Sequence, residues 1–109
     1  MQVDFRLQNV ALVEAVQRYV ERRLLFGLGR FGDRVGQVAV RISPMAGGEH
    51  QCRISTELRP FGRVAVRETD SDLFAAIDRA TGRVGRLFGR ELQRVREARM
   101  GHESVRIAA

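Results

Sequence analysis

The sequence predicts an α+β fold, a two-layer sandwich in which a four-stranded sheet carries two helices on one face. Two observations lead to this prediction. Short segments alternate apolar and polar residues with the period of two that half-exposed strands show. Longer segments repeat apolar residues every three or four positions, as helices that pack on a sheet do. The order along the chain is β-α-β-β-β-α, and a length of 109 residues fits one domain.

The first strand and the first helix begin the chain. Residues 2–7 alternate apolar and polar side chains, which predicts a strand with one buried face. A helix is expected over residues 12–31. Its last turns contain Gly27 and Gly29, each of which weakens a helix by on the order of 1 kcal/mol relative to alanine. Gly32 is a suitable residue to end it.

Further alternation predicts the remaining strands over residues 37–42, 51–58 and 63–67. The segment 44–48 is rich in turn residues, and the segment 59–62 favours a hairpin connection. Because these strands are apolar on one side, their other side is expected to face water. The side chains expected to point inward are Val38, Val40, Ile42, Cys52, Ile54, Thr56, Leu58, Val64 and Val66.

The last element is a long helix. Asp70, Ser71 and Asp72 are candidates to cap its start. Its apolar stripe runs from Leu73 to Val95, and the helix is expected to continue to about Arg99. The segment 100–109 has no convincing period, so a flexible tail is expected there. The expected domain is therefore 1–99.

The charge balance points to a polyanionic partner. The chain has 19 basic residues, all of them arginine, and a net charge of +6. A small basic domain of this kind binds nucleic acid or, less often, an anionic membrane. The alternative is a merely well-solvated surface in which codon bias replaced lysine by arginine. No apolar run is long enough to span a bilayer and no signal peptide is evident, so no membrane partner and a cytoplasmic location are expected.

Residues for catalysis or metal binding are sparse. The single cysteine, Cys52, excludes an intramolecular disulfide and a cysteine-based zinc site. His50 lies two residues before it, but no third group is evident to orient a catalytic pair, so Cys52 is interpreted as a core residue. His102 lies in the polar tail. We therefore expect no enzyme, no cofactor, no metal and no small-molecule substrate.

An arginine stripe on the last helix carries the strongest functional signal. Its members are Arg79, Arg83, Arg86, Arg90 and Arg94. At 100° per residue they fall within a sector of roughly 80°, about 120° from the apolar stripe, and they extend over about 22 Å. Arginine donates in a fork that fits phosphate oxygens, and A-form RNA is read largely through its backbone. Stabilisation of the helix dipole explains the stripe less well, because that effect acts only in the last turn.

A strip of glycines borders the arginine stripe at Gly82, Gly85 and Gly89. Interior helix glycines are destabilising, so they call for an explanation. Three explanations remain open: close approach of an RNA backbone, close approach of the first helix, or neutral drift. The outward face of the sheet holds both arginines and acids and is interpreted as a mixed, solvated surface.

Two sets of residues carry a resemblance to a known family. The segment Asp72–Asp78, with the sequence DLFAAID, opens the last helix. The N-terminal part contributes, in order, Met1–Val3, Asn9–Val10, Glu14–Ala15, Tyr19–Val20 and Asp33–Arg34. Together they resemble the hibernation-promoting factor family of short ribosome-associated inhibitors, over about residues 1–97. It implies a fold similar to double-stranded-RNA-binding domains.

The resemblance also implies a function. Such proteins dock in the small ribosomal subunit, in the channel where mRNA and tRNA bind, and inhibit translation reversibly without being enzymes. The family's basic positions fall here on Arg23, Arg83, Arg86, Arg90 and Arg94, whereas Arg79 comes from the stripe alone. Arg22 is added as the neighbour of Arg23.

The chain also departs from the family at two places. Leu12–Val13 stands where a polar cap is usual, and Phe26 stands where a second basic residue is common.

The leading hypothesis is thus a protein that is monomeric when free and binds rRNA. A general double-stranded-RNA-binding module is the first alternative. A regulator whose basic face meets an acidic protein is the second.

Overall fold

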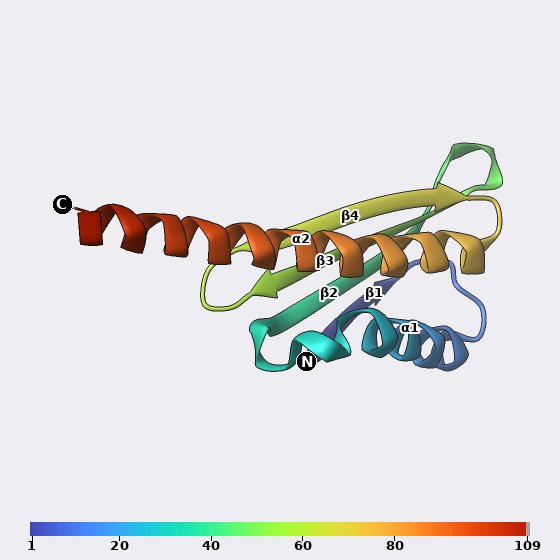
Figure 1. The fold of residues 1–109 in the computed structure, drawn as a ribbon. Helices are drawn as coiled ribbons and strands as arrows, with labels where there is room; N and C mark the ends of the chain where they lie inside the picture. Colours follow the sequence, from blue (N-terminus) through green and yellow to red (C-terminus); the bar gives the residue numbers. More distant parts are fainter. Residues whose placement is uncertain (109) are drawn as a thin grey trace.

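The structure, a computed structural model, describes the backbone of residues 1–108 and the side chains of residues 1–99. Strands and helices follow in the predicted order (Figure 1). The elements are β1 (Gln2–Leu7), α1 (Val13–Leu28), the 3-10 helix η1 (Gly29–Arg34), β2 (Val35–Pro44), the 3-10 turn η2 (Ala46–Gly48), β3 (His50–Leu58), β4 (Arg63–Asp70) and α2 (Leu73–Ala108).

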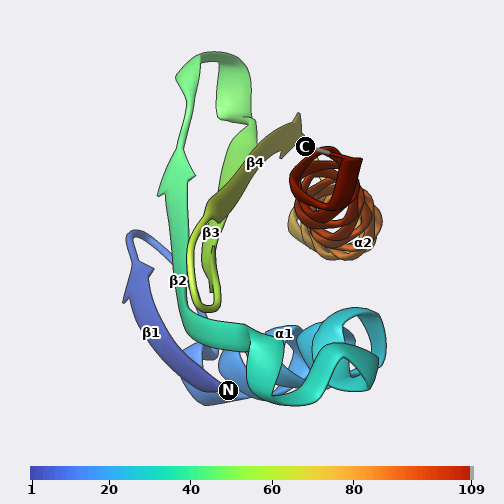
Figure 2. The same ribbon diagram turned by 60° about the vertical axis from the view of Figure 1, so that its left-hand side comes forward.

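The strands form one mixed sheet in the order β1-β2-β3-β4. The pair β1–β2 is parallel, and α1 makes the crossover between its strands, while β2–β3 and β3–β4 are antiparallel hairpins. Figure 2 shows both helices on the same side of the sheet, which leaves the other side open. The predicted α+β class, a four-stranded sheet with two helices, is therefore confirmed.

The core lies between the sheet and the two helices. The nine side chains predicted to point inward from β2, β3 and β4 are all buried. Those of β1 are half-buried. From the helices, Leu24 and Phe88 are fully buried against this layer. The period of two and the helical stripe therefore predicted the buried faces correctly.

The first helix differs from the prediction at both ends. Leu12 is 80% exposed and takes a left-handed backbone with φ 54°, so α1 begins one residue later at Val13. The α-helical part stops at Leu28, and the chain continues to Arg34 as a 3-10 helix. Gly32, with φ 53° and ψ −126°, provides the kink inside that segment, a conformation that glycine adopts without a steric penalty.

The last two elements are longer than predicted. The ladder between β3 and β4 continues until Asp70 pairs with His50, so β4 does not end at Arg67. The helix α2 continues past Arg99 to Ala108 and includes most of the segment for which a tail was expected. Mobility of residues 100–109 stays a prediction. Within residues 1–108 no helix is both long and apolar enough to cross a bilayer.

Candidate nucleic-acid interface

The start of α2 is fixed by a small polar cluster that includes the first arginine of the stripe. Asp72 caps the helix by accepting hydrogen bonds from the backbone N–H of Phe74 at 3.0 Å and of Ala75 at 3.5 Å. The Arg79 guanidinium donates to the carbonyl oxygen of Thr69 at 2.7 Å and lies 2.9 Å from the Asp70 carboxylate. Arg79 therefore joins α2 to the end of β4, and its donors are already engaged.

The Asp70 carboxylate is stabilised in its charged form by the same cluster. Its Oδ1 accepts a hydrogen bond from the backbone N–H of Asp72 at 2.8 Å. This hydrogen bond, and after it the one from Arg79, lowers the pKa of Asp70 below its ordinary value. At neutral pH the side chain is thus ionised and available to pair with Arg79.

Two further members of the stripe have acidic neighbours. Arg83 lies 3.9 Å from Glu68 of β4. Arg94 contacts Glu91 through two nitrogens, at 2.6 and 3.1 Å, and this hydrogen-bonded pair lowers the pKa of Glu91. All four side chains reach solvent, and ion pairs between exposed side chains contribute little to stability. The stripe is therefore less uniformly positive than the helical spacing alone indicated.

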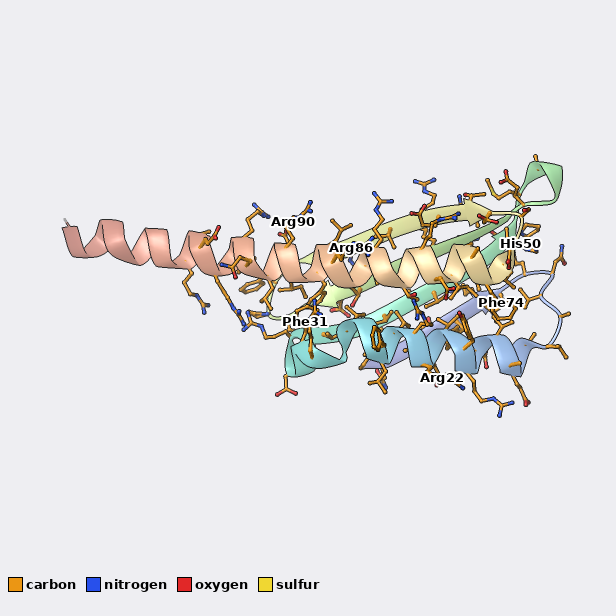
Figure 3. The ribbon with its side chains drawn as sticks, turned by 45° about the vertical axis from the view of Figure 1, so that its right-hand side comes forward. Arg22, Phe31, His50, Phe74, Arg86 and Arg90 are labelled. Atoms are coloured by element: carbon orange, nitrogen blue, oxygen red, sulfur yellow. The ribbon has the colours of Figure 1, made fainter. Side chains whose placement is uncertain are left out.

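Arg86 and Arg90 form the unpaired middle of the stripe. Both are exposed, and within residues 1–99 neither makes an ion pair (Figure 3). They lie one helical turn apart, roughly 6 Å along the axis. These two side chains are free to bind an anion without first giving up a carboxylate.

A groove between α1 and α2 brings a second set of arginines beside Arg86. It has a volume of about 280 Å³, and its lining includes Arg23, Arg30 and Arg86. Phe26 also lines it and is 83% exposed, with the Arg23 guanidinium 6.0 Å from its ring centre. The groove therefore combines three cations with one exposed aromatic ring.

Arg23 is oriented by a part-exposed contact between the helices, in which only its Nε is buried. Its Nε lies 3.4 Å from the Asp78 carboxylate, near enough for an ion pair, but the N–H is not aligned for a hydrogen bond. Asp78 also accepts a hydrogen bond from the Tyr19 hydroxyl, which raises the pKa of Tyr19. The ring of Phe74 packs edge-on against the ring of Tyr19, with 4.9 Å between the two ring centres. These contacts hold Arg23 at the junction of α1 and α2.

The glycines of α2 allow the two helices to approach closely. A Cβ on Gly85 would lie 2.8 Å from the carbonyl oxygen of Gly27, which is closer than a Cβ atom comes to its non-bonded neighbours in folded proteins. A Cβ on Gly89 would lie 3.2 Å from the ring of Phe31. Of the three explanations left open by the sequence, approach of the first helix holds for Gly85, while Gly89 makes room for Phe31 of η1, the segment that follows that helix. At Gly82 a Cβ would meet only the Arg86 guanidinium, at 3.4 Å.

Alanine substitutions at two of these glycines are expected to have opposite effects. Gly85→Ala forces α1 and α2 apart and should lower the free energy of unfolding by about 1–2 kcal/mol, because overpacking outweighs the gain in helix propensity. Gly82→Ala has room for its methyl group and should raise that free energy by up to about 1 kcal/mol. Urea denaturation of both variants measures the difference, and a stabilised Gly85→Ala variant would contradict the helix contact.

Arg22 lies apart from this groove. It lines a shallow hollow with Met1 and Val3. The structure thus brings Arg23 and Arg86 together in the groove. Arg22 lies outside the groove, although it is next to Arg23 in the sequence. Arg30 and Phe26 are groove residues that the sequence interpretation did not select. Arg30 lies two turns after Arg23, but the glycines around it obscured the helical period.

Cys52 is a core residue, as predicted. It is fully buried in β3, and burial raises the pKa of its thiol to about 12. A nucleophilic cysteine needs the opposite shift, toward the thiolate. Among the described residues, no three His, Cys, Asp or Glu side chains gather where they would hold a metal ion.

Comparisons with known proteins show which family and which structures this chain is similar to. A family model described as sigma 54 modulation protein / S30EA ribosomal protein matches residues 3–96. The chain is similar to the N-terminal domain of Protein Y from Thermus thermophilus, with 34% identity and a TM-score of 0.70 over 83% of this chain and 98% of that one. It shares the fold of a ribosomal subunit interface protein from Coxiella burnetii, with 12% identity and a TM-score of 0.72 over 85% and 99% of the two chains. Comparison with curated protein sequences gave no match.

Proposed function

Because the chain belongs to the sigma 54 modulation protein / S30EA ribosomal protein family, we propose that it binds rRNA in the decoding channel of the small ribosomal subunit and reversibly inhibits translation. The observation that carries the proposal is the arginine groove between α1 and α2. There Arg23, Arg30 and Arg86 converge, and Arg90 follows on the next turn of α2. A bound domain of this size would occupy the space that mRNA and tRNA need.

The chemistry of the groove suits an RNA backbone. Guanidinium groups donate two parallel hydrogen bonds to phosphate oxygens and lose little hydration in doing so. The exposed ring of Phe26 provides a surface on which an unpaired base can stack, and stacking of this kind is common where proteins meet single-stranded RNA. The family commonly has a basic residue at this position. In this chain Phe26 offers a stacking contact there in place of a charge.

The proposal assigns distinct roles to the predicted arginines. Arg23, Arg86 and Arg90 contact phosphates directly, and Arg30 joins them. Arg83 and Arg94 exchange an exposed carboxylate for a phosphate on binding. Arg79 positions the start of α2, while Arg22 contacts RNA only where the rRNA wraps around α1. The protein acts by occupancy, as a cytoplasmic monomer without a catalytic role.

Sedimentation with purified small subunits tests this function. The protein is expected to travel with the subunits in a sucrose gradient at low salt. Four phosphate contacts predict that the binding constant falls at least roughly 50-fold between 50 and 200 mM salt, because each contact releases counterions. A simple RNA duplex serves as competitor. Equal affinity for the duplex would favour a general double-stranded-RNA-binding module, and binding to neither would contradict the proposal.

A further inference from the structure

The open face of the sheet carries a row of arginines that strand register brings into line. Arg6 pairs with Arg41, Arg41 with Arg53, and Arg53 with Arg67, so one arginine from every strand lies in the same row. All four are exposed. The sequence interpretation took this face as a mixed, solvated surface because Asp4 and Glu57 share it with the arginines.

This row has an energetic cost, and the one acid that lines the same hollow as Arg6, Arg41 and Arg53 is Asp4. Neighbouring strands lie about 4.8 Å apart, so the row extends over roughly 14 Å. Like charges directly opposite one another destabilise a sheet. Within residues 1–99 none of the four arginines makes an ion pair. A surface that concentrates unneutralised charge in this way is suited to a polyanion.

The shape of the face leaves room beside the row for a bound chain. The adjacent row of the sheet is Asp4, Ala39, Ser55 and Ala65, in which three of the four side chains are small. A hollow of about 320 Å³ lies there, bordered by Arg6, Arg41 and Arg53. At the β4 edge, Arg83 of α2 lines a second hollow together with Arg53 and Arg67. The row is thereby continuous with the arginine stripe of α2.

We propose that this row, Arg6, Arg41, Arg53 and Arg67, is a second binding surface for the phosphate backbone of RNA. The inference rests on the proposed function in taking RNA as the partner, and it adds a second point of contact on the opposite side of the domain. With the groove between the helices, it lets one copy of the protein touch two RNA segments at once.

RNA fits this face better than an acidic protein does. The outward positions of the four described strands hold no side chain more apolar than alanine. The centres of protein interfaces depend on large apolar or aromatic anchors, which are missing there. The face also lacks aromatic rings for base stacking, so contacts to phosphates, independent of base sequence, are expected.

The test compares the wild-type chain with two double variants. Arg41→Gln/Arg53→Gln removes two charges from the centre of the row. The matched control, Arg18→Gln/Arg96→Gln, removes the same charge from exposed positions outside it. Binding to small subunits is measured by sedimentation, and binding to a short single-stranded RNA and to poly-glutamate by fluorescence anisotropy. Thermal unfolding confirms that each variant is folded.

The row variant is expected to bind both RNA targets at least about 10-fold more weakly than the wild type. For the single-stranded RNA, the slope of log K against the logarithm of the salt concentration should be smaller in magnitude by about 1.4, which is the contribution of two phosphate contacts. The control should change affinity less than about 3-fold.

Each outcome separates this inference from the proposed function. Equal losses of RNA affinity in the row variant and the control would contradict the second RNA-binding surface. So would row-dependent binding of poly-glutamate that is tighter than that of RNA. Neither result would contradict the binding of small subunits. Row-dependent binding of the short RNA without any binding of subunits would support the surface and contradict the proposed function.

Discussion

Reversing the charge of Arg83, Arg86 and Arg90 to glutamate is expected to abolish co-sedimentation with small ribosomal subunits. A hydrogen bond to a charged group contributes about 1.5–3 kcal/mol when it is formed in a partly desolvated interface. Loss of three such contacts lowers the affinity at least about 1,000-fold, before the repulsion between glutamate and phosphate is counted. The three side chains are exposed on α2, so the fold itself should persist.

The control for this variant carries the same change in charge elsewhere. Arg18, Arg96 and Arg99 are exposed and lie outside the stripe, on α1 or on other sides of α2. Their replacement by glutamate should weaken binding by long-range electrostatics only and should restore it as the salt concentration is lowered. Circular dichroism on both triple variants reports folding. If the stripe variant still sediments with subunits as well as the control does, the assignment of the groove and stripe as the binding surface is wrong.

Truncation of Phe88 to alanine is expected to have the largest effect on stability. Phe88 is fully buried, and the ring of Phe31 packs on it with a centroid distance of 4.8 Å. Removal of a buried phenyl ring costs about 3–5 kcal/mol, a large share of the 5–15 kcal/mol that stabilises a typical domain. The midpoint of thermal unfolding should therefore fall by roughly 15 °C or more.

Phe61→Ala provides the matched comparison. The same ring is removed, but Phe61 lies in the hairpin between β3 and β4 and is 83% exposed. Its free energy of unfolding should change by less than about 0.5 kcal/mol. Differential scanning calorimetry compares the two. A Phe88→Ala variant with an unchanged midpoint of thermal unfolding would contradict the contribution of this buried ring to the core.

The local periodicities were sufficient to predict the elements and their faces. Alternation over residues 37–42 or 51–58 depends on neighbours two positions apart, and the structure confirms the buried side that it indicated. The exposed positions of Arg86 and Arg90 followed from helical spacing in the same way. Element ends were less well predicted, because they depend on partners. β4 reaches Asp70 only because His50 of β3 pairs with it.

The candidate site could be predicted in part only. Helical spacing identified the stripe, but two of the acids that engage it, Glu68 and Asp70, come from β4, which local spacing does not place beside α2. Glu91 lies three residues before Arg94, and its pairing could have been read from the sequence. The same limit applies to the groove. That Arg23 lines the groove beside α2 while Arg22 lines a separate hollow with Met1 and Val3 depends on how α1 is rotated on the sheet, and that rotation is set by packing.

The sequence by itself determined the fold class, the buried faces and the concentration of arginine on the last helix, since each is written in spacings of two to four residues. The tertiary structure alone decided which distant residues meet. Gly27 of α1 and Gly85 of α2 approach closely, which brings the two sides of the groove together. Strand register aligns Arg6, Arg41 and Arg53 on the open face. A shift of register by one residue would turn these side chains into the core, and nothing in the local pattern of charges specifies the alignment. It is the apolar face, packed against the two helices, that selects the register and so brings the arginines into a row.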